Sequence, residues 1–241
     1  MNKLTVIVAD DAARDREYIA NMLPHYDLHI GSNGKEALDL FCQHETDYVL
    51  SDLQMPELNG IEFARAIWDI RPAACIVFWS QHKDEMYLRT LSKIIPADTV
   101  YGYILKDSSS DVFQKAVSFV FEENQCWIDP KIRSLHARVQ SKDKNITDAE
   151  YEVLIDIALG LTDNVIAQRH YLTRRGVQSR LKSLYQKLDI ERMLAADKEI
   201  EVMNPRARAV SVALQRGLLN TEELSEEENK LKVWLKREGI F

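Results

Sequence analysis

The sequence has little of the residues that mark several classes of protein. It contains 3 Cys, 8 Gly and 6 Pro among 241 residues. Scattered cysteines without a CxxC pair are too few for a disulfide framework or a thiolate zinc site. The low glycine and proline contents exclude collagen-like and low-complexity chains. We therefore expect a globular protein whose thiols are reduced, as in the cytoplasm.

Long hydrophobic runs are also absent from the sequence. The longest candidate, residues 70–80, is interrupted by Arg71 and Pro72, and it is shorter than the roughly 18 apolar residues that a transmembrane helix needs. Near the start, Asp10 and Asp11 occur too early for the apolar region of a signal peptide. These observations predict a cytoplasmic protein that has no membrane partner.

Negative charge is concentrated in the first half of the chain. The formal net charge is -7, and residues 1–125 carry 20 Asp and Glu against 11 Lys and Arg. The stretch from Thr173 to Lys187 has the opposite character, with five basic residues and no acidic ones. An acidic half can bind a cation, whereas a local basic stretch attracts a phosphate backbone.

Apolar, β-branched runs alternate with helical patterns in residues 1–125. They predict strands at residues 4–9, 27–30, 48–51, 74–79 and 101–105. Such alternation is typical of a doubly wound parallel sheet with helices on both faces, in which ligands bind beyond the carboxyl ends of the strands. Polar residues follow or end four of these strands, namely Asp10, Asp11, Asp52, Ser80 and Lys106. We expect them to meet at one edge of the sheet.

The chemistry of this set fits reversible phosphorylation. Three carboxylates at one edge repel each other unless a cation lies among them, and Mg²⁺ prefers oxygen ligands. A carboxylate can act as a nucleophile and become an aspartyl phosphate, whose oxygens need positive charge around them. Mg²⁺ can supply that charge on one side and the ammonium group of Lys106 on the other, while the hydroxyl group of Ser80 can donate a hydrogen bond.

Four motifs make residues 1–125 similar to the receiver domain of two-component response regulators. They are Ala9-Asp10-Asp11, Ser51 to Pro56 with Gly60, Trp79-Ser80, and Gly102 to Lys106. The resemblance implies a flavodoxin-like, five-stranded α/β fold and phosphorylation by a sensor histidine kinase.

The same resemblance implies a role for each residue of the set. Asp52 is the implied phospho-acceptor, Ser80 the switch hydroxyl, and Lys106 the group that binds the phosphoryl oxygens. The implied Mg²⁺ ligands are Asp10, Asp11, Asp52 and the backbone carbonyl of Gln54. Tyr103 matches the switch aromatic of the family, whose ring turns inward on activation. The alternative is that Tyr103 is an ordinary half-buried tyrosine of its strand.

The second half of the chain has a different organisation. Residues 126–146 contain few large apolar residues and predict a linker, and residues 147–220 predict an all-helical domain. A short helix, a tight turn and a basic helix form a helix-turn-helix pattern there, whose second helix can enter the major groove of DNA. The residues outside the apolar face of that helix are available for bases or phosphates, and they are Arg174, Arg175, Gln178, Ser179 and Lys182. A solvated basic helix within a bundle is the alternative.

Residues 147–188 resemble the LuxR-type domain of the NarL/FixJ response regulators. Matching residues include Gly160-Leu161-Thr162, Ile166-Ala167, Leu172-Thr173 and Lys187-Leu188. The resemblance implies that Thr173 caps the recognition helix and that a homodimer binds two half-sites of promoter DNA. The implied nucleic-acid contacts are Arg175, Gln178, Arg180 and Lys182. The chain departs from the family in an insertion near residues 191–203 and in an additional C-terminal helix within residues 221–241.

These observations predict a phosphorylation-switched transcriptional regulator of a two-component system. One rival keeps the switch but replaces DNA binding by a protein-interaction output, because the recognition helix and the C-terminal segments differ from the family. The other rival is an enzyme of the haloacid-dehalogenase type. We disfavour it because that chemistry needs a second aspartate two residues after the nucleophile, and Gln54 and Ala12 stand at the two possible positions.

Overall fold

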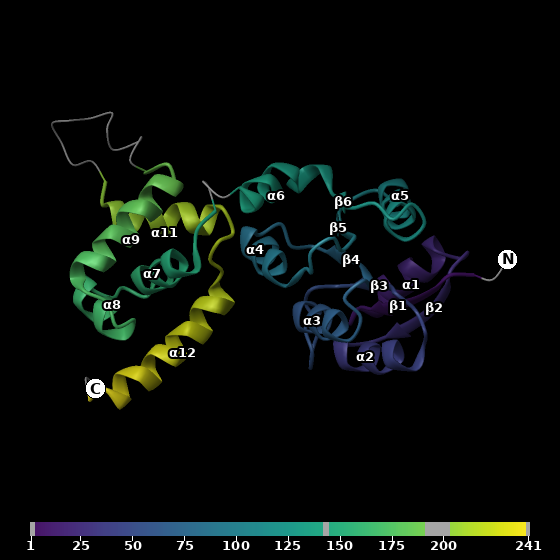
Figure 1. Ribbon diagram of the computed structural model, residues 1–241, viewed down its shortest axis with the longest axis horizontal. Helices are drawn as coiled ribbons and strands as arrows, with labels where there is room; N and C mark the ends of the chain where they lie inside the picture. The colour runs from purple at the N-terminus through teal and green to yellow at the C-terminus, as the bar shows by residue number, and fades with distance from the viewer. Residues whose placement is uncertain (1–2, 142–144, 191–202, 240–241) are drawn as a thin grey trace. The chain divides into compact units, whose positions relative to one another are not determined.

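A computed structural model describes residues 3–141, 145–190 and 203–239. The chain divides into two compact units (Figure 1). The first consists of Met1–Lys83 with Tyr87–His136, and the second of Asp84–Met86 with Ala137–Phe241. Among the described residues, no helix has the length and apolar character needed to cross a membrane.

The first unit contains a parallel sheet in the order β2-β1-β3-β4-β5-β6. The strands are β1 (Thr5–Ala9), β2 (Asp27–Gly31), β3 (Tyr48–Ser51), β4 (Cys75–Ser80), β5 (Tyr101–Leu105) and β6 (Trp127–Ile128). Every residue of β4 is buried, because a central strand of a parallel sheet is covered by helices on both faces. The five predicted strands are all confirmed, and β6 is an addition to them.

Helices follow the strands in the order that the sequence predicts. They are α1 (Ala13–Met22), α2 (Gly34–Gln43), α3 (Gly60–Ile70), α4 (Glu85–Ile94) and α5 (Ser110–Phe121). Asn33 caps α2, since its side chain accepts a hydrogen bond from the backbone N–H of Glu36. Asn59 and Glu62 form a complete capping box at α3, which fixes the start of this helix just after the loop that follows β3.

The segment after α5 contains more structure than the predicted linker. It forms β6, a short 3₁₀ helix η1 (Pro130–Ile132) and α6 (Arg133–Gln140). Strand β6 pairs with β5, and the Trp127 ring packs edge-on against Phe119, with 5.4 Å between the ring centroids. The buried carboxylate of Asp129 accepts hydrogen bonds from the Ser108 hydroxyl and the Leu105 N–H. Two apolar residues and one buried acid were too short a pattern to predict a strand from periodicity.

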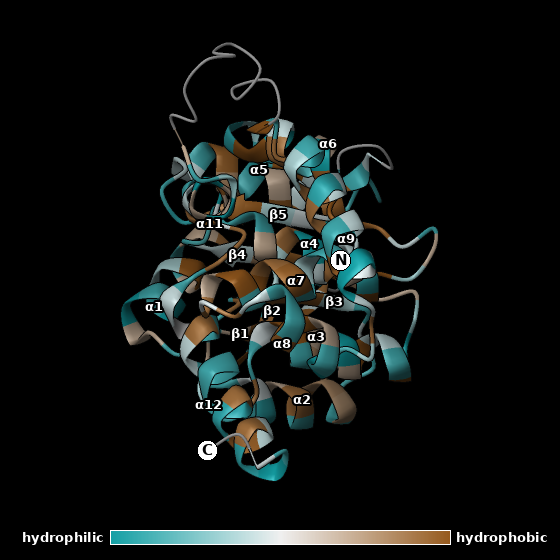
Figure 2. Cartoon of the chain, turned by 90° about the vertical axis from the view of Figure 1, so that its left-hand side faces the viewer, coloured by the Kyte–Doolittle hydropathy of each residue, from teal (hydrophilic) through white to brown (hydrophobic). Residues whose placement is uncertain are grey.

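The described part of the second unit is helical, as predicted. Its helices are α7 (Asp148–Ala158), α8 (Asp163–Arg169), α9 (Arg174–Lys187), α11 (Pro205–Gln215) and α12 (Thr221–Arg237). Figure 2 shows hydrophobic colour over much of α7, the helix that contacts α9, α11 and α12. The core formed by these helices includes Val153, Leu154, Ile166, Val177, Leu184, Ala209 and Ala213. Residues 191–202 of the predicted insertion lie outside the described residues.

The additional C-terminal helix α12 packs on the other helices of this unit. Its N-cap is Asn220, whose side chain accepts a hydrogen bond from the Glu223 N–H. The carboxylate of Glu223 accepts a hydrogen bond from the Tyr151 hydroxyl of α7, at 2.7 Å. Leu224 packs against the helical core, and Leu231 is 6% exposed. These apolar residues of α12 therefore pack against the rest of the helical unit.

A buried ion pair connects the start of α7 to the end of α9. The Glu150 carboxylate lies 2.7 Å from Lys187 Nζ and also accepts from the Ser183 hydroxyl. Burial opposes ionisation of Glu150, but Lys187, Ser183 and Thr147 outweigh it and lower the pKa of the carboxyl below its ordinary value. Glu150 therefore stabilises the fold above its unfolded-state pKa, and this contribution is lost as the pH falls through the lowered value.

We expect Glu150→Gln to reduce the free energy of unfolding by about 2 kcal/mol at pH 7, because Lys187 loses its charged partner. The difference from the wild type should shrink as the pH is lowered through the depressed pKa of Glu150, because the wild-type carboxyl then becomes protonated. Urea unfolding at several pH values measures it, and Glu226→Gln on the exposed face of α12 is the control. An equal difference at all pH values would contradict the ion-pair explanation.

Candidate phosphorylation site and nucleic-acid interface

Three aspartates meet beyond the carboxyl ends of β1 and β3. One carboxylate oxygen from each of Asp10, Asp11 and Asp52 lies within 4.8 Å of the other two. Asp10 is fully buried, Asp52 is 8% exposed, and Asp11 is exposed to solvent. The parallel sheet brings these residues together as predicted, because β1 and β3 are neighbours in register.

Lys106 enters the same site from the end of β5. Its Nζ lies 2.8 Å from Asp10 Oδ2 and 2.8 Å from Asp52 Oδ2. Burial of the ammonium group opposes its charge, but the surrounding carboxylates outweigh this and raise the pKa of Lys106 above its ordinary value. The ammonium group also lies 5.0 Å from the centre of the Trp79 ring. Lys106 therefore stays protonated next to the predicted phospho-acceptor.

A fourth carboxylate, which the sequence patterns did not reveal, completes this site. Asp15 in the first turn of α1 places Oδ2 2.7 Å from Lys106 Nζ. Burial opposes ionisation of Asp15, but Lys106 and Arg14 outweigh it and lower the pKa of the carboxyl. At Asp10 the effect of burial outweighs the contact with Lys106, so the pKa of this carboxyl is raised above its ordinary value. Helical spacing could have indicated Asp15 from the sequence, because it lies four positions before Ile19, and these two are the buried residues of α1.

The donor set fits a small divalent cation. Asp10, Asp11 and Asp52 offer only oxygen ligands, which Mg²⁺ prefers, and few protein ligands leave positions for water and phosphate oxygens. A cation among them also relieves the repulsion between carboxylates packed this closely. Asp52 keeps a fixed orientation because its Oδ1 accepts a hydrogen bond from the Leu53 N–H.

The predicted switch residues both contact His82, in the loop after β4. Ser80 ends β4 and is fully buried, with its hydroxyl oxygen 3.4 Å from the His82 N–H. Tyr103 is 1% exposed, and its hydroxyl donates to the backbone carbonyl of His82 at 2.8 Å. The ring is thus fully inside the unit rather than half-buried. Gln54, in the loop after Asp52, donates from Nε2 to the Tyr87 hydroxyl of α4 at 2.8 Å.

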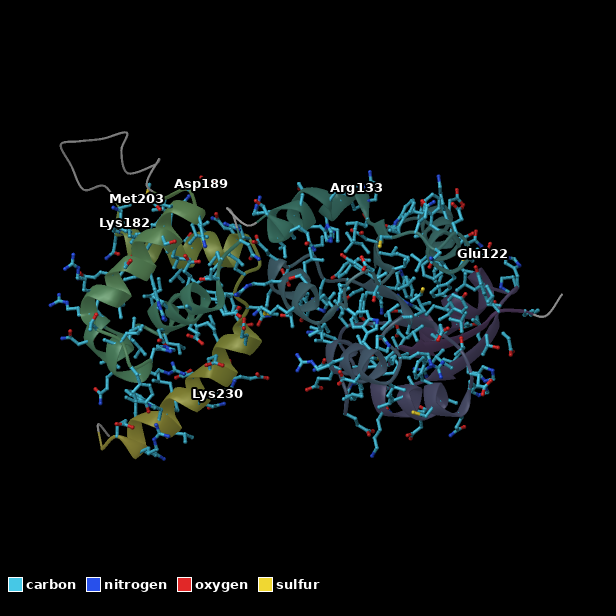
Figure 3. All side chains as sticks on the ribbon, in the orientation of Figure 1. Glu122, Arg133, Lys182, Asp189, Met203 and Lys230 are labelled. Atoms are coloured by element: carbon cyan, nitrogen blue, oxygen red, sulfur yellow. The ribbon has the colours of Figure 1, made fainter. Side chains whose placement is uncertain are left out.

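The candidate nucleic-acid surface lies on α9 of the second unit. Thr173 caps this helix by accepting from the Gly176 N–H, as predicted. The apolar face is buried through Val177, Leu181 and Leu184. The predicted contacts Arg174, Arg175, Gln178, Ser179 and Lys182 are all exposed, and Lys182 is labelled on α9 in Figure 3. Exposed cationic and amide side chains therefore share the face that does not pack in the core.

Arg180 differs from the other predicted contacts of α9. It is partly buried, and its guanidinium group donates to the backbone carbonyl of Ala149 at 3.5 Å. The structure therefore directs this side chain toward the start of α7. Spacing alone did not show this, because position 180 lies at the border between the apolar and the exposed faces of α9.

Comparisons with known proteins find a family that matches the first unit and relatives that match most of the chain. The family model described as "Response regulator receiver domain" matches residues 6–118. The chain is 29% identical over 232 residues to transcriptional regulatory protein YdfI of Bacillus subtilis (strain 168), covering 92% of this chain and 100% of the relative. It is 24% identical to transcriptional regulatory protein DegU of Brevibacillus brevis, covering 90% of this chain and 95% of the relative. Residues 6–118 therefore match a receiver domain, and the chain as a whole is similar to proteins that are named as transcriptional regulatory proteins.

Solved structures share the fold of this chain. The RcsB–DNA complex matches with a TM-score of 0.57 and 19% identity, covering 88% of this chain and 99% of that chain. RcsB of Salmonella typhimurium matches with a TM-score of 0.58 and 19% identity, covering 78% of this chain and 94% of that one. The similarity of fold therefore extends over both the sheet-containing unit and the helical unit.

Proposed function

We propose that this chain is a response regulator and a transcription factor whose DNA binding is switched by phosphorylation of Asp52. The observation that carries the proposal is the convergence of Lys106 with Asp10 and Asp52 at one edge of the sheet, in a chain that also presents a basic helix-turn-helix. Two further findings support a DNA-binding output. The relatives YdfI and DegU are named as transcriptional regulatory proteins, and RcsB has been solved in complex with DNA.

In the proposed reaction, Asp52 receives a phosphoryl group from a phosphohistidine of a sensor kinase. A carboxylate oxygen of Asp52 forms the new bond to phosphorus, the P–N bond breaks, and its electron pair returns to the imidazole nitrogen. Asp10, Asp11, Asp52 and the Gln54 carbonyl would hold Mg²⁺, which would neutralise charge on the transferred group. Lys106 supplies positive charge from the other side, and the Ser80 hydroxyl donates a hydrogen bond.

Phosphorylation then changes the population of receiver conformations. Ser80 and Tyr103 both contact the loop that contains His82, so a movement of the Ser80 hydroxyl toward the phosphoryl group is transmitted to this loop. We place the receiver at residues 1–125, the connecting segment at 126–146 and the DNA-binding domain at 147–220. In the active form a homodimer inserts α9 of each copy into the major groove of a promoter half-site.

Selection of bound genomic fragments, with and without an acyl-phosphate donor and Mg²⁺, tests this function. We expect enrichment of specific promoter fragments by the phosphorylated protein, less enrichment without donor, and no response to donor in Asp52→Asn. Binding should weaken steeply as salt is added, because contacts to phosphates release counterions. Absence of binding to any fragment in both phosphorylation states would favour the protein-interaction output instead.

A further inference from the structure

Asp15 belongs to the site by geometry but has no part in the phosphoryl transfer described above. Its contact with Lys106, at 2.7 Å, is as short as those of Asp10 and Asp52, at 2.8 Å. The Asp15 side chain is 11% exposed and the Lys106 side chain 16% exposed. A lysine ammonium group has three donors, so each can be directed at one of these three carboxylates.

The three carboxylates that contact Lys106 differ in whether they also belong to the candidate metal site. Asp10 and Asp52 belong to the group of carboxylates that can hold a metal ion, and Asp15 does not. A divalent cation bound to Asp10 and Asp52 repels the ammonium group and weakens their attraction for it. Phosphorylation then converts Asp52 into an acyl phosphate. Asp15 alone keeps a carboxylate that is committed only to neighbouring cationic side chains.

The other neighbours of Asp15 do not explain its burial. Arg14 Nε lies 3.4 Å from Asp15 Oδ1, but the Arg14 side chain is 93% exposed, so this ion pair contributes little. A carboxylate within a buried helix face is costly unless it is paired, and Lys106 is the buried partner that pairs it. The position of Asp15 is therefore explained by Lys106 and not by the packing of α1.

We propose that Asp15 is a positioning residue, which holds the Lys106 ammonium group in the site while Mg²⁺ and the phosphoryl group engage Asp10 and Asp52. The inference rests on the proposed function, because it concerns the same phosphorylation site. It gives Lys106 a fixed anchor on α1, at a distance from which the ammonium group can still reach a phosphoryl oxygen on Asp52.

The test is a double-mutant cycle with the full-length chain. At saturating Mg²⁺ we expect Asp15→Leu to slow phosphorylation by a small acyl-phosphate donor roughly tenfold, the scale of one charge-assisted hydrogen bond. Asp15→Asn should be intermediate, since its amide oxygen still accepts one hydrogen bond. In a Lys106→Ala background Asp15→Leu should cause no further slowing, because the side chain that it positions is gone. Glu17→Gln, on the exposed side of α1, is the matched control.

Trp79 supplies a readout that does not depend on phosphoryl transfer, because Lys106 Nζ lies 5.0 Å from the ring centre. Titration of Asp15→Leu with Mg²⁺ alone should displace the ammonium group and produce a fluorescence change that the wild type and the double variant lack. Equal slowing in both backgrounds, or an unchanged or faster rate in Asp15→Leu, overturns the inference. If Asp15→Leu does not fold, the phosphorylation rates of Asp15→Asn with and without Lys106→Ala test the inference in the same way. A wild type that takes up no phosphoryl group overturns the proposed function itself.

Discussion

Asp52→Asn is expected to abolish phosphoryl uptake, because the amide has no carboxylate oxygen that can attack phosphorus. The variant should still fold. Asparagine preserves the acceptor for the Leu53 N–H, and the ammonium group of Lys106 keeps Asp10 and Asp15 as charged partners. Removal of one of four neighbouring carboxylates also lowers their mutual repulsion. Intact-protein mass spectrometry after incubation with Mg²⁺ and an acyl-phosphate donor measures the gain of one phosphoryl group.

A matched variant separates the loss of this carboxylate from the loss of any negative charge. Asp39→Asn removes an exposed carboxylate of α2 and should be labelled like the wild type. Mg²⁺ affinity should fall in Asp52→Asn and remain unchanged in Asp39→Asn, because only the first variant loses an oxygen of the metal-binding group. Labelling of Asp52→Asn at the wild-type level would place the phospho-acceptor at another residue.

The double variant Arg175→Ala, Lys182→Ala is expected to weaken DNA binding about a hundredfold, since a specific contact to a base or phosphate is worth on the order of 1–3 kcal/mol. Both side chains are exposed on α9, so their removal should leave the helical core and the melting temperature nearly unchanged. The slope of the logarithm of the binding constant against the logarithm of the salt concentration should fall by about two if both residues contact phosphates. Fluorescence anisotropy with a selected promoter fragment measures both quantities.

The control for this prediction is Lys236→Ala, Arg237→Ala in α12. It removes the same charge from exposed positions of the same unit. A loss of affinity similar to that of the α9 variant would mean that only the net charge of the unit matters. A nearly wild-type affinity would assign the binding to the face of α9.

Residues of the first unit show which parts of this structure were predictable. The strands that precede Asp10, Asp52 and Lys106 are short and largely apolar, a pattern typical of a buried parallel sheet. Once the strands are known, the parallel order places their carboxyl ends at one edge, so most of the site follows from topology. Asp15 did not follow from it, because α1 carries this residue and its inward direction depends on the rotation of the helix.

In the second unit, local features of the helices could be predicted from the sequence, but contacts between helices could not. Thr173 and the apolar face of α9 were predictable, because capping and helical periodicity are local properties of the chain. The contact of Arg180 with the Ala149 carbonyl joins residues 31 positions apart and is set by the packing of two helices. The same holds for the Glu223 carboxylate, which accepts from Tyr151 of α7, 72 positions away. Contacts that depend on the tertiary packing of helices cannot be predicted from the local spacing of residues in the sequence.

Strand β6 has a consequence for how copies of this chain can associate. It pairs with β5 through Gly102 and Tyr103, so it occupies backbone donors and acceptors that an unprotected border of the sheet would offer to a strand from another molecule. The strand has only two residues and is soon followed by Pro130, which has no backbone N–H to donate. Growth of the sheet by strand addition is therefore blocked on this side, and intermolecular contacts there must be made by side chains.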